Sequence, residues 1–163
     1  MPRRMRHLLG LAAVVAAVLA LAAWQWRQDA ADAPPALTVL DPDAITRIAL
    51  SLPEAATEHY EKRAGHWWRT DGMPARADDA RVRMLAEIAA TPVGRWRAAA
   101  EFTPAKIGLT PPAAVLELDG QRLEFGARLA TAPGRYVRVG TRIALVGERA
   151  MPQSPATAAT GLR

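Results

Sequence analysis

An unbroken apolar run near the start of the chain is the feature that most constrains how this sequence can be organised. Residues 8–24 hold only leucine, alanine, valine, one glycine and a final tryptophan. With Gln25 and Trp26 the run reaches 19 residues, close to the roughly 20 that a helix needs to cross a hydrocarbon core of about 30 Å. We therefore predict that residues 8–26 form a transmembrane signal anchor, with the lipid bilayer as its partner.

The charges around this run predict its orientation. Three arginines lie in the basic flank formed by residues 1–7: Arg3, Arg4 and Arg6. Since basic flanks stay on the cytoplasmic side, we expect a single-pass protein of the inner (cytoplasmic) membrane, with its N-terminus in the cytoplasm and its C-terminal domain in the periplasm. Trp24 and Trp26 suit the far headgroup layer, because indole rings prefer the boundary between lipid and water.

A cleaved signal peptide is the alternative for this segment. A basic start, an apolar centre and small residues at Ala20 and Ala22 fit a cleavage site. The run continues past that site at full hydrophobicity, however, and ends in a tryptophan pair. We favour the uncleaved anchor, and either alternative exports the rest of the chain.

Composition divides the remaining residues into three segments. Residues 27–43 are rich in alanine, aspartate and proline, which predicts an extended stalk. Residues 44–149 carry the periodic apolar patterns of a folded domain. Residues 150–163 are mainly proline, alanine, threonine, serine and glutamine with almost no periodicity, which predicts a disordered tail.

A β-hairpin is predicted around Ala64-Gly65, with strands over residues 58–63 and 66–70. A two-residue loop would pair Arg63 with His66, Lys62 with Trp67 and Glu61 with Trp68. Trp67 and Trp68 would then point to opposite faces of the sheet, so that one can join the core while the other covers an edge.

The other elements follow from caps, turns and alternation. Asp78 is a good N-cap for a helix over residues 79–90, and Thr103, Pro104 and Gly108 delimit a one-turn helix. Further strands are predicted at residues 45–52, 94–100, 114–118, 121–125, 135–139 and 142–146. The predicted fold class is α+β: an N-terminal transmembrane helix, then a small antiparallel-sheet domain with one main helix and a short one-turn helix.

Catalytic, cofactor-binding and metal-binding residues are not indicated, so we expect none of these sites. The chain has no cysteine, and its histidines, His7, His59 and His66, lack the spacing of a metal site. Residues 27–163 carry 18 basic and 16 acidic side chains, which argues against nucleic-acid binding. A hydrolase with paired carboxylates stays open, because facing carboxylates cannot be recognised from sequence.

Aromatic and basic residues suggest two interaction surfaces. Trp67 and Trp68 invite stacking on a glycan, although a small domain more often uses tryptophan in its core. The last predicted hairpin contributes Arg135, Tyr136, Arg138 and Arg142, whose arginines suggest a basic strip for lipid headgroups or an acidic partner. A solvated strand edge protected by charge is the alternative for the arginines.

Several motifs in one order resemble the bacterial family called domain of unknown function 4340. They are Gly65-x-Trp67-Trp68, Pro74-Ala75-Arg76-Ala77-Asp78, the stretch from Phe102 through Lys106-Ile107-Gly108-Leu109 to Pro111-Pro112, Phe125-Gly126, and Gly134-Arg135-Tyr136-Val137-Arg138. The resemblance covers about residues 40–148. It implies a membrane-anchored envelope protein, in some cases encoded beside transport-type membrane machinery, and it transfers no catalytic residue.

We therefore expect a non-enzymatic accessory or interaction module of an envelope or transport-type membrane complex, with an envelope membrane protein as its partner. The alternative is an envelope glycan-binding protein or hydrolase, possibly released by signal peptide cleavage.

Overall fold

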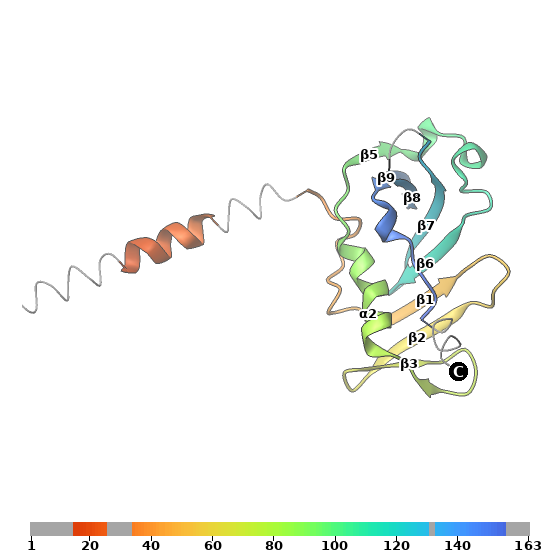
Figure 1. Ribbon diagram of the computed structural model, residues 1–163, viewed down its shortest axis with the longest axis horizontal. Coiled ribbons are helices and arrows are strands. Elements are labelled where there is room, and N and C mark those ends of the chain that lie inside the picture. The colour runs from red at the N-terminus through yellow and green to blue at the C-terminus, as the bar shows by residue number, and fades with distance from the viewer. Residues whose placement is uncertain (1–14, 26–33, 131–132, 156–163) are drawn as a thin grey trace, which may run out of the picture. The chain divides into compact units, whose positions relative to one another are not determined.

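The computed structural model describes residues 15–25, 34–130 and 133–155 (Figure 1). The chain divides into two compact units, residues 1–34 and 35–163. In the first unit residues 15–25 are helical, and Trp24 is 58% exposed. The predicted basic flank with Arg3, Arg4 and Arg6, and also residues 8–14 and Trp26 of the predicted anchor, lie outside the described residues.

Within the ranges described, no helix has both the length and the hydropathy that a membrane span requires.

The second unit is built on a nine-stranded antiparallel sheet with the order β4-β3-β2-β1-β6-β7-β8-β9-β5. The strands are β1 (Arg47–Ser51), β2 (Glu58–Arg63), β3 (His66–Arg69), β4 (Ala75–Arg76), β5 (Arg95–Ala98), β6 (Ala114–Leu118), β7 (Gln121–Arg128), β8 (Arg135–Val139) and β9 (Arg142–Val146). The helices are α2 (Asp79–Glu87) and the 3₁₀ turns η1 (Ile88–Ala90), η2 (Ala99–Glu101), η3 (Pro104–Ile107) and η4 (Glu148–Ala150). The prediction of a small antiparallel-sheet domain with one main helix and a short one-turn helix is confirmed.

The register of the first hairpin is the predicted one. Arg63 lies opposite His66, Lys62 opposite Trp67 and Glu61 opposite Trp68. The turn is possible because Ala64 and Gly65 both adopt positive φ, 50° and 81°, as the twist of a two-residue hairpin loop demands. Trp67 is 4% exposed beneath α2, whereas Trp68 lies on the opposite face of the sheet.

Helix α2 is fixed to the sheet at its N-terminus. The carboxylate of Asp78 accepts hydrogen bonds from the backbone N–H groups of Ala80 and Arg81, at 3.0 and 3.2 Å, which is an ordinary N-cap. The next residue, Asp79, accepts from the Trp67 N–H at 2.7 Å, which ties the first turn of the helix to β3. Val82, Leu85 and Ala86 then face the sheet and are buried.

Apolar residues pack against both faces of the sheet. The main core lies under α2, which crosses one face (Figure 1), and includes Leu50, Leu116, Phe125 and Val137. On the opposite face Ile143 packs with Ile107 and Leu109, which the segment after β5 supplies. The segment that carries Ile107 and Leu109 can pack on this face only because residue 126 is a glycine. A Cβ at position 126 would lie 2.3 Å from the carbonyl oxygen of Ile107.

Both predicted boundaries of the domain are wrong. Leu37, assigned to the stalk, is 2% exposed, and its N–H donates to the Thr91 carbonyl at 2.8 Å. Residues 150–155, assigned to the disordered tail, are ordered against the domain: Ala150 is buried and Met151 packs on the core. Isolated apolar residues in segments rich in proline and alanine have no period that would mark them as core. Residues 27–33 and 156–163 lie outside the described ranges.

Candidate functional site

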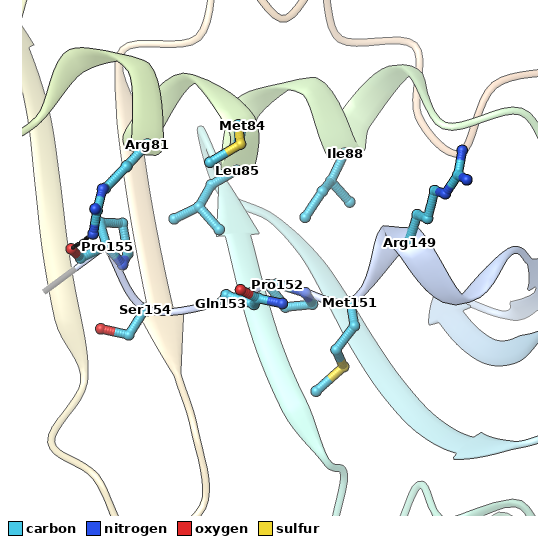
Figure 2. Close-up of a pocket in the computed structure, with 10 residues that line it drawn as sticks. All are labelled: Arg81, Met84, Leu85, Ile88, Arg149, Met151, Pro152, Gln153, Ser154 and Pro155. Carbon is cyan, nitrogen blue, oxygen red and sulfur yellow. Dashed lines mark hydrogen bonds between the residues drawn. The ribbon is translucent and has the colours of Figure 1, made fainter. Parts of the chain in front are cut away.

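A groove runs between α2 and the C-terminal segment that follows η4 (Figure 2). We call residues 151–155 the strap. The groove has a volume of about 390 Å³ and is lined by Arg81, Met84, Leu85, Ile88, Arg149, Met151, Pro152, Gln153, Ser154 and Pro155. Its walls are therefore one helix face and one extended segment, about 65 residues apart in the chain.

Helical spacing supplies one wall of the groove. Arg81, Met84 and Leu85 of α2 and Ile88 at the start of η1 recur at intervals of three and four residues and so form one stripe along the helix. Leu85 and Ile88 are buried and form the base of the stripe, whereas Met84 is 59% exposed. An exposed thioether beside a groove is an adaptable apolar contact, because methionine is unbranched and polarizable.

Polar contacts hold the strap against the domain. The hydroxyl of Ser154 donates to Oε1 of Glu58 at 2.5 Å, and Nη1 of Arg81 donates to the Pro155 carbonyl at 3.5 Å. Pro152 and Pro155 lack an N–H and have a fixed φ, which suits an extended segment outside the sheet. The strap is thus anchored to β2 and to α2 at the same end of the groove.

Glu58 is a buried carboxylate at the start of β2, where it joins the strap to the core. Its Oε2 accepts from the hydroxyl of Tyr60 at 2.8 Å, and Tyr60 itself is 3% exposed. Burial, together with this hydrogen bond to Glu58, raises the pKa of Tyr60 well above its ordinary value. Tyr60 therefore acts here as a neutral hydrogen-bond donor.

An ion pair lies next to the hydrogen bonds of Glu58 and Tyr60, at the open end of the β2–β3 hairpin. Nη2 and Nε of Arg69 contact the carboxylate of Asp71 at 2.6 and 2.8 Å, and the N–H of His59 donates to Asp71 at 3.2 Å. The hydrogen bonds from Arg69 are the main cause that lowers the pKa of Asp71 to about 2. The pair pins the turn after β3 against β2.

The charges of the groove are all of one sign. Arg81 lies at one end and Arg149 at the other (Figure 2), and none of the ten lining residues is acidic. A second hollow of about 530 Å³ continues along α2 and shares Met84, Ile88 and Arg149 with the first; its lining adds one carboxylate, Glu87. The single sign of charge therefore holds for the groove but not for this second hollow.

The predicted basic strip does not exist as one surface. Arg138 lies opposite Ile143 while Val139 lies opposite Arg142, so the side chains of Arg138 and Arg142 leave opposite faces of the hairpin. Arg135 donates to the Gly126 carbonyl, and its burial lowers its pKa. Arg138 pairs with the buried Glu124. Alternation along a strand separates residues three positions apart, which the prediction overlooked.

The predicted aromatic residues are mainly structural. Trp67 is in the core, so it offers no stacking face to a glycan. Tyr136 makes an edge-to-face contact with Phe102, with ring centroids 5.7 Å apart, inside the smaller core. Trp68 is half-buried on the face of the sheet opposite α2, between Glu61 and Arg76.

Another hollow, away from α2, lies at the end of the sheet where β5 meets the turn of the β8–β9 hairpin. We call it the arginine hollow; it measures about 720 Å³ and is lined by Trp96, Arg97, Ala98, Ala99, Ala100, Glu101, Arg138, Gly140, Thr141 and Arg142. Arg138 and Arg142 belong to the predicted interaction surface, whereas Trp96 and Arg97 carry no sequence pattern that marks them for one. Pairing of β5 with β9 brings them together over about 45 residues, and no local pattern indicates that pairing.

Comparisons with known proteins give no relative: neither a family model nor a curated protein nor a solved structure matches the chain. In the three described ranges, no group of three or more histidine, aspartate or glutamate side chains is placed to hold a metal ion.

Proposed function

We propose that this protein is a single-pass protein of the inner membrane whose periplasmic domain serves as a non-enzymatic interaction module of an envelope or transport-type membrane complex. The apolar run of residues 8–26, with arginines before it and tryptophans at its end, supports the anchor. The resemblance to the domain of unknown function 4340 family supports the envelope setting. The groove along α2 supports the role in binding.

The groove is the observation on which the binding role rests. Its base is apolar, its helical wall keeps Met84 59% exposed, and no residue of its lining is acidic. Arg81 pairs with Asp78, outside the lining, at 3.4 Å. Exposed apolar surface flanked by like charge is typical of a surface that a partner covers. A solvated helix face would instead place charged residues at the position of Met84.

The occupant that fits best is an extended segment of a partner, with apolar side chains between acidic ones. The strap shows that this face of α2 packs against extended chain, since residues 151–155 already lie along it (Figure 2). A carboxylate at one end of the segment would pair with Arg149, because guanidinium groups bind carboxylates through forked hydrogen bonds. A second carboxylate would accept from the remaining N–H donors of Arg81, which already contacts Asp78 and the Pro155 carbonyl. Apolar side chains would meet Met84 and Ile88.

Affinity purification of tagged full-length protein from detergent-solubilised membranes tests the role. We expect a membrane protein to co-purify with the wild type and to be lost, about tenfold or more, with Met84→Glu and with Arg149→Glu. Arg83→Glu is the matched control for Arg149→Glu, because Arg83 is exposed on α2 outside the groove and its substitution changes the charge equally. Equal recovery with all variants would refute the groove as the docking site.

A photo-crosslinker identifies what occupies the groove. Placed at Met84 it should label a partner peptide with both apolar and acidic residues, whereas the same group at Met73, 91% exposed and outside the groove, should not. A labelled peptide with basic residues would contradict the charge argument. If no companion co-purifies at all, the accessory role itself fails.

A further inference from the structure

The chain enters the sheet domain at one end of the sheet. The N–H of Val93 donates to the Pro35 carbonyl at 2.8 Å, and Ala36 forms a β-bridge with Pro92, just before β5. Only the eight residues 27–34 therefore lie between the predicted anchor and this domain. They span at most about 29 Å in any conformation, because a fully extended chain advances no more than about 3.6 Å per residue.

This tether is shorter than the domain is wide. A compact unit of roughly 130 residues, such as residues 35–163, has a radius of gyration of about 14 Å and a diameter of about 35 Å. If residues 8–26 cross the bilayer, as the proposed function holds, the sheet cannot stand on its opposite end, because the tether would then have to span the whole domain. The end that receives the chain is the one within reach of the lipid.

The strand register gathers arginines at this same end of the sheet. β7 ends at Arg128 and β8 begins at Arg135, and these two residues lie directly opposite each other. Arg135 also lies opposite Val146, the last residue of β9. On the other side of β9, β5 begins at Arg95, which lies opposite Leu145.

Arg149 belongs to the same end. It lines a hollow together with Gly147, which follows β9, and with Pro92, the residue that pairs with Ala36. Its side chain is exposed. Arg149 thus lies next to the point at which the chain enters the domain.

This end of the sheet has an excess of positive charge. Nε of Arg128 lies 3.5 Å from Oε1 of Glu148, and both side chains are largely exposed, and Glu87 lines the hollow beside Arg149. No carboxylate among the described residues forms an ion pair with Arg149 or with Arg95, which is also exposed. Four guanidinium groups therefore stand against two carboxylates. We call this end of the sheet, with Glu87, Arg95, Arg128, Arg135, Glu148 and Arg149, the entry end.

The arginines of the entry end do not point at one spot. Arg95 leaves the opposite face of the sheet from Arg128 and Arg135, because its partner Leu145 and their neighbour Val146 are adjacent in β9 and alternate in direction. A small ligand on one face would miss part of this charge. A flat surface placed against the end of the sheet meets the side chains of both faces.

We propose that the entry end rests on the anionic lipid headgroups of the membrane that holds the anchor. Basic residues close to a bilayer are attracted by the negative potential of anionic lipids, and guanidinium groups donate to headgroup phosphates. This attraction fades within a Debye length of about 10 Å, so it needs the closeness that the short tether enforces. The inference rests on the proposed anchor and goes beyond the docking role of the groove on α2.

Full-length protein reconstituted into vesicles tests this surface, because the chain has no cysteine and accepts single thiols. Ala130→Cys places a thiol in the segment between β7 and β8, at the entry end, and Thr141→Cys places one in the β8–β9 turn, at the opposite end; both positions are exposed. A membrane-impermeant fluorescent maleimide labels the domains outside the vesicles. Energy transfer to a lipid-linked acceptor then measures the height of each label above the bilayer.

The vesicles contain either phosphatidylcholine alone or equal amounts of phosphatidylcholine and phosphatidylglycerol. With phosphatidylglycerol we expect the label at position 130 to lie at the headgroups and the label at position 141 about 17 Å higher, the length of the five residues of β8. In phosphatidylcholine alone the label at position 130 should lie farther from the bilayer. The same height of this label in both kinds of vesicle would refute the surface.

Flotation of the vesicles separates failure of the surface from failure of the anchor. Protein that floats with phosphatidylcholine alone is anchored without help from charge. Flotation with neither kind of vesicle would overturn both proposals. Flotation only with phosphatidylglycerol would overturn the anchor and support the surface.

Variants assign the attraction to the entry end. The double variant Arg95→Gln/Arg128→Gln removes two of its charges, and neither residue lines the groove on α2. We expect the difference in height between the two kinds of vesicle to be lost. Arg97→Gln/Arg142→Gln is the matched control, because it removes the same charge from exposed positions at the opposite end of the sheet. An equal loss in this control would show non-specific attraction and refute the surface, and unfolding curves verify that each variant has kept its fold.

Discussion

The ion pair between Arg69 and Asp71 should contribute measurably to the free energy of unfolding of the domain. The side chain of Asp71 is 12% exposed and receives hydrogen bonds from Arg69 and from the His59 N–H. These contacts lower its pKa from 3.8 to about 2, and each unit of such a shift corresponds to about 1.4 kcal/mol. Because Arg69 is 39% exposed, solvent screens the pair, and we expect Asp71→Asn to lower the free energy of unfolding by about 1–2 kcal/mol.

The pH dependence of this effect has a definite sign. The pKa of Asp71 is lower in the folded protein than in the unfolded chain, so the folded state favours the charged form. The stabilisation is complete above the unfolded value of 3.8 and is lost as the pH falls toward about 2. The difference between wild type and Asp71→Asn should therefore be constant from neutral pH to about pH 5 and should shrink below pH 4.

Urea unfolding at a series of pH values measures this difference directly. Subtraction of the variant from the wild type cancels the other carboxylates with lowered pKa, such as Asp79 and Glu101. Asp43→Asn is the control, because Asp43 is exposed and its carboxylate makes no hydrogen bond to the described residues. A difference between wild type and Asp71→Asn that stays constant down to pH 2, or one no larger than that of Asp43→Asn, would contradict this account of the ion pair.

Four further substitutions test how the domain is held together. Ser154→Ala leaves Glu58 without one of its donors and should lower the free energy of unfolding by about 1–3 kcal/mol, measured by urea unfolding; no change would mean that the strap does not contribute to the fold. Gly126→Ala puts a Cβ against the Ile107 carbonyl and should displace the segment that carries Ile107 and Leu109 from the smaller core, seen as faster amide exchange in residues 105–109. Trp67→Ala should cost about 3–5 kcal/mol, since a nearly fully buried ring is lost, whereas Trp68→Ala should cost much less.

The parts of the fold that depend on neighbours in sequence were predictable. The hairpin at Ala64-Gly65 and its register follow from turn chemistry and from strand alternation. The helix start at Asp78 follows from the capping preference for aspartate. In each case the residues that decide the structure lie within about ten positions of one another, so the pattern is visible in the sequence.

The parts of the fold that depend on distant residues were not predictable from the sequence. Leu37 packs beside Thr91, and Ser154 bonds to Glu58 across 96 positions. Neither residue has a periodic context, so composition alone placed them in a stalk and a tail. The candidate sites depend on the same long-range pairings, because the groove needs the strap and the arginine hollow needs β5 beside β9. This is why the arginines of the predicted strip do not share one face of the hairpin, although Arg138 and Arg142 both line the arginine hollow.

Ionic strength tests how the groove binds its occupant. In the groove, Arg81 and Arg149 flank an apolar base, so most of the affinity should come from apolar contact and should change little with salt. Screening shortens the range of charge attraction from about 10 Å at 0.1 M salt to about 3 Å at 1 M. Partner recovery that survives high salt is therefore the outcome that this geometry requires. Recovery that is lost as the salt concentration rises would mean that charge, and not apolar contact, dominates binding in the groove.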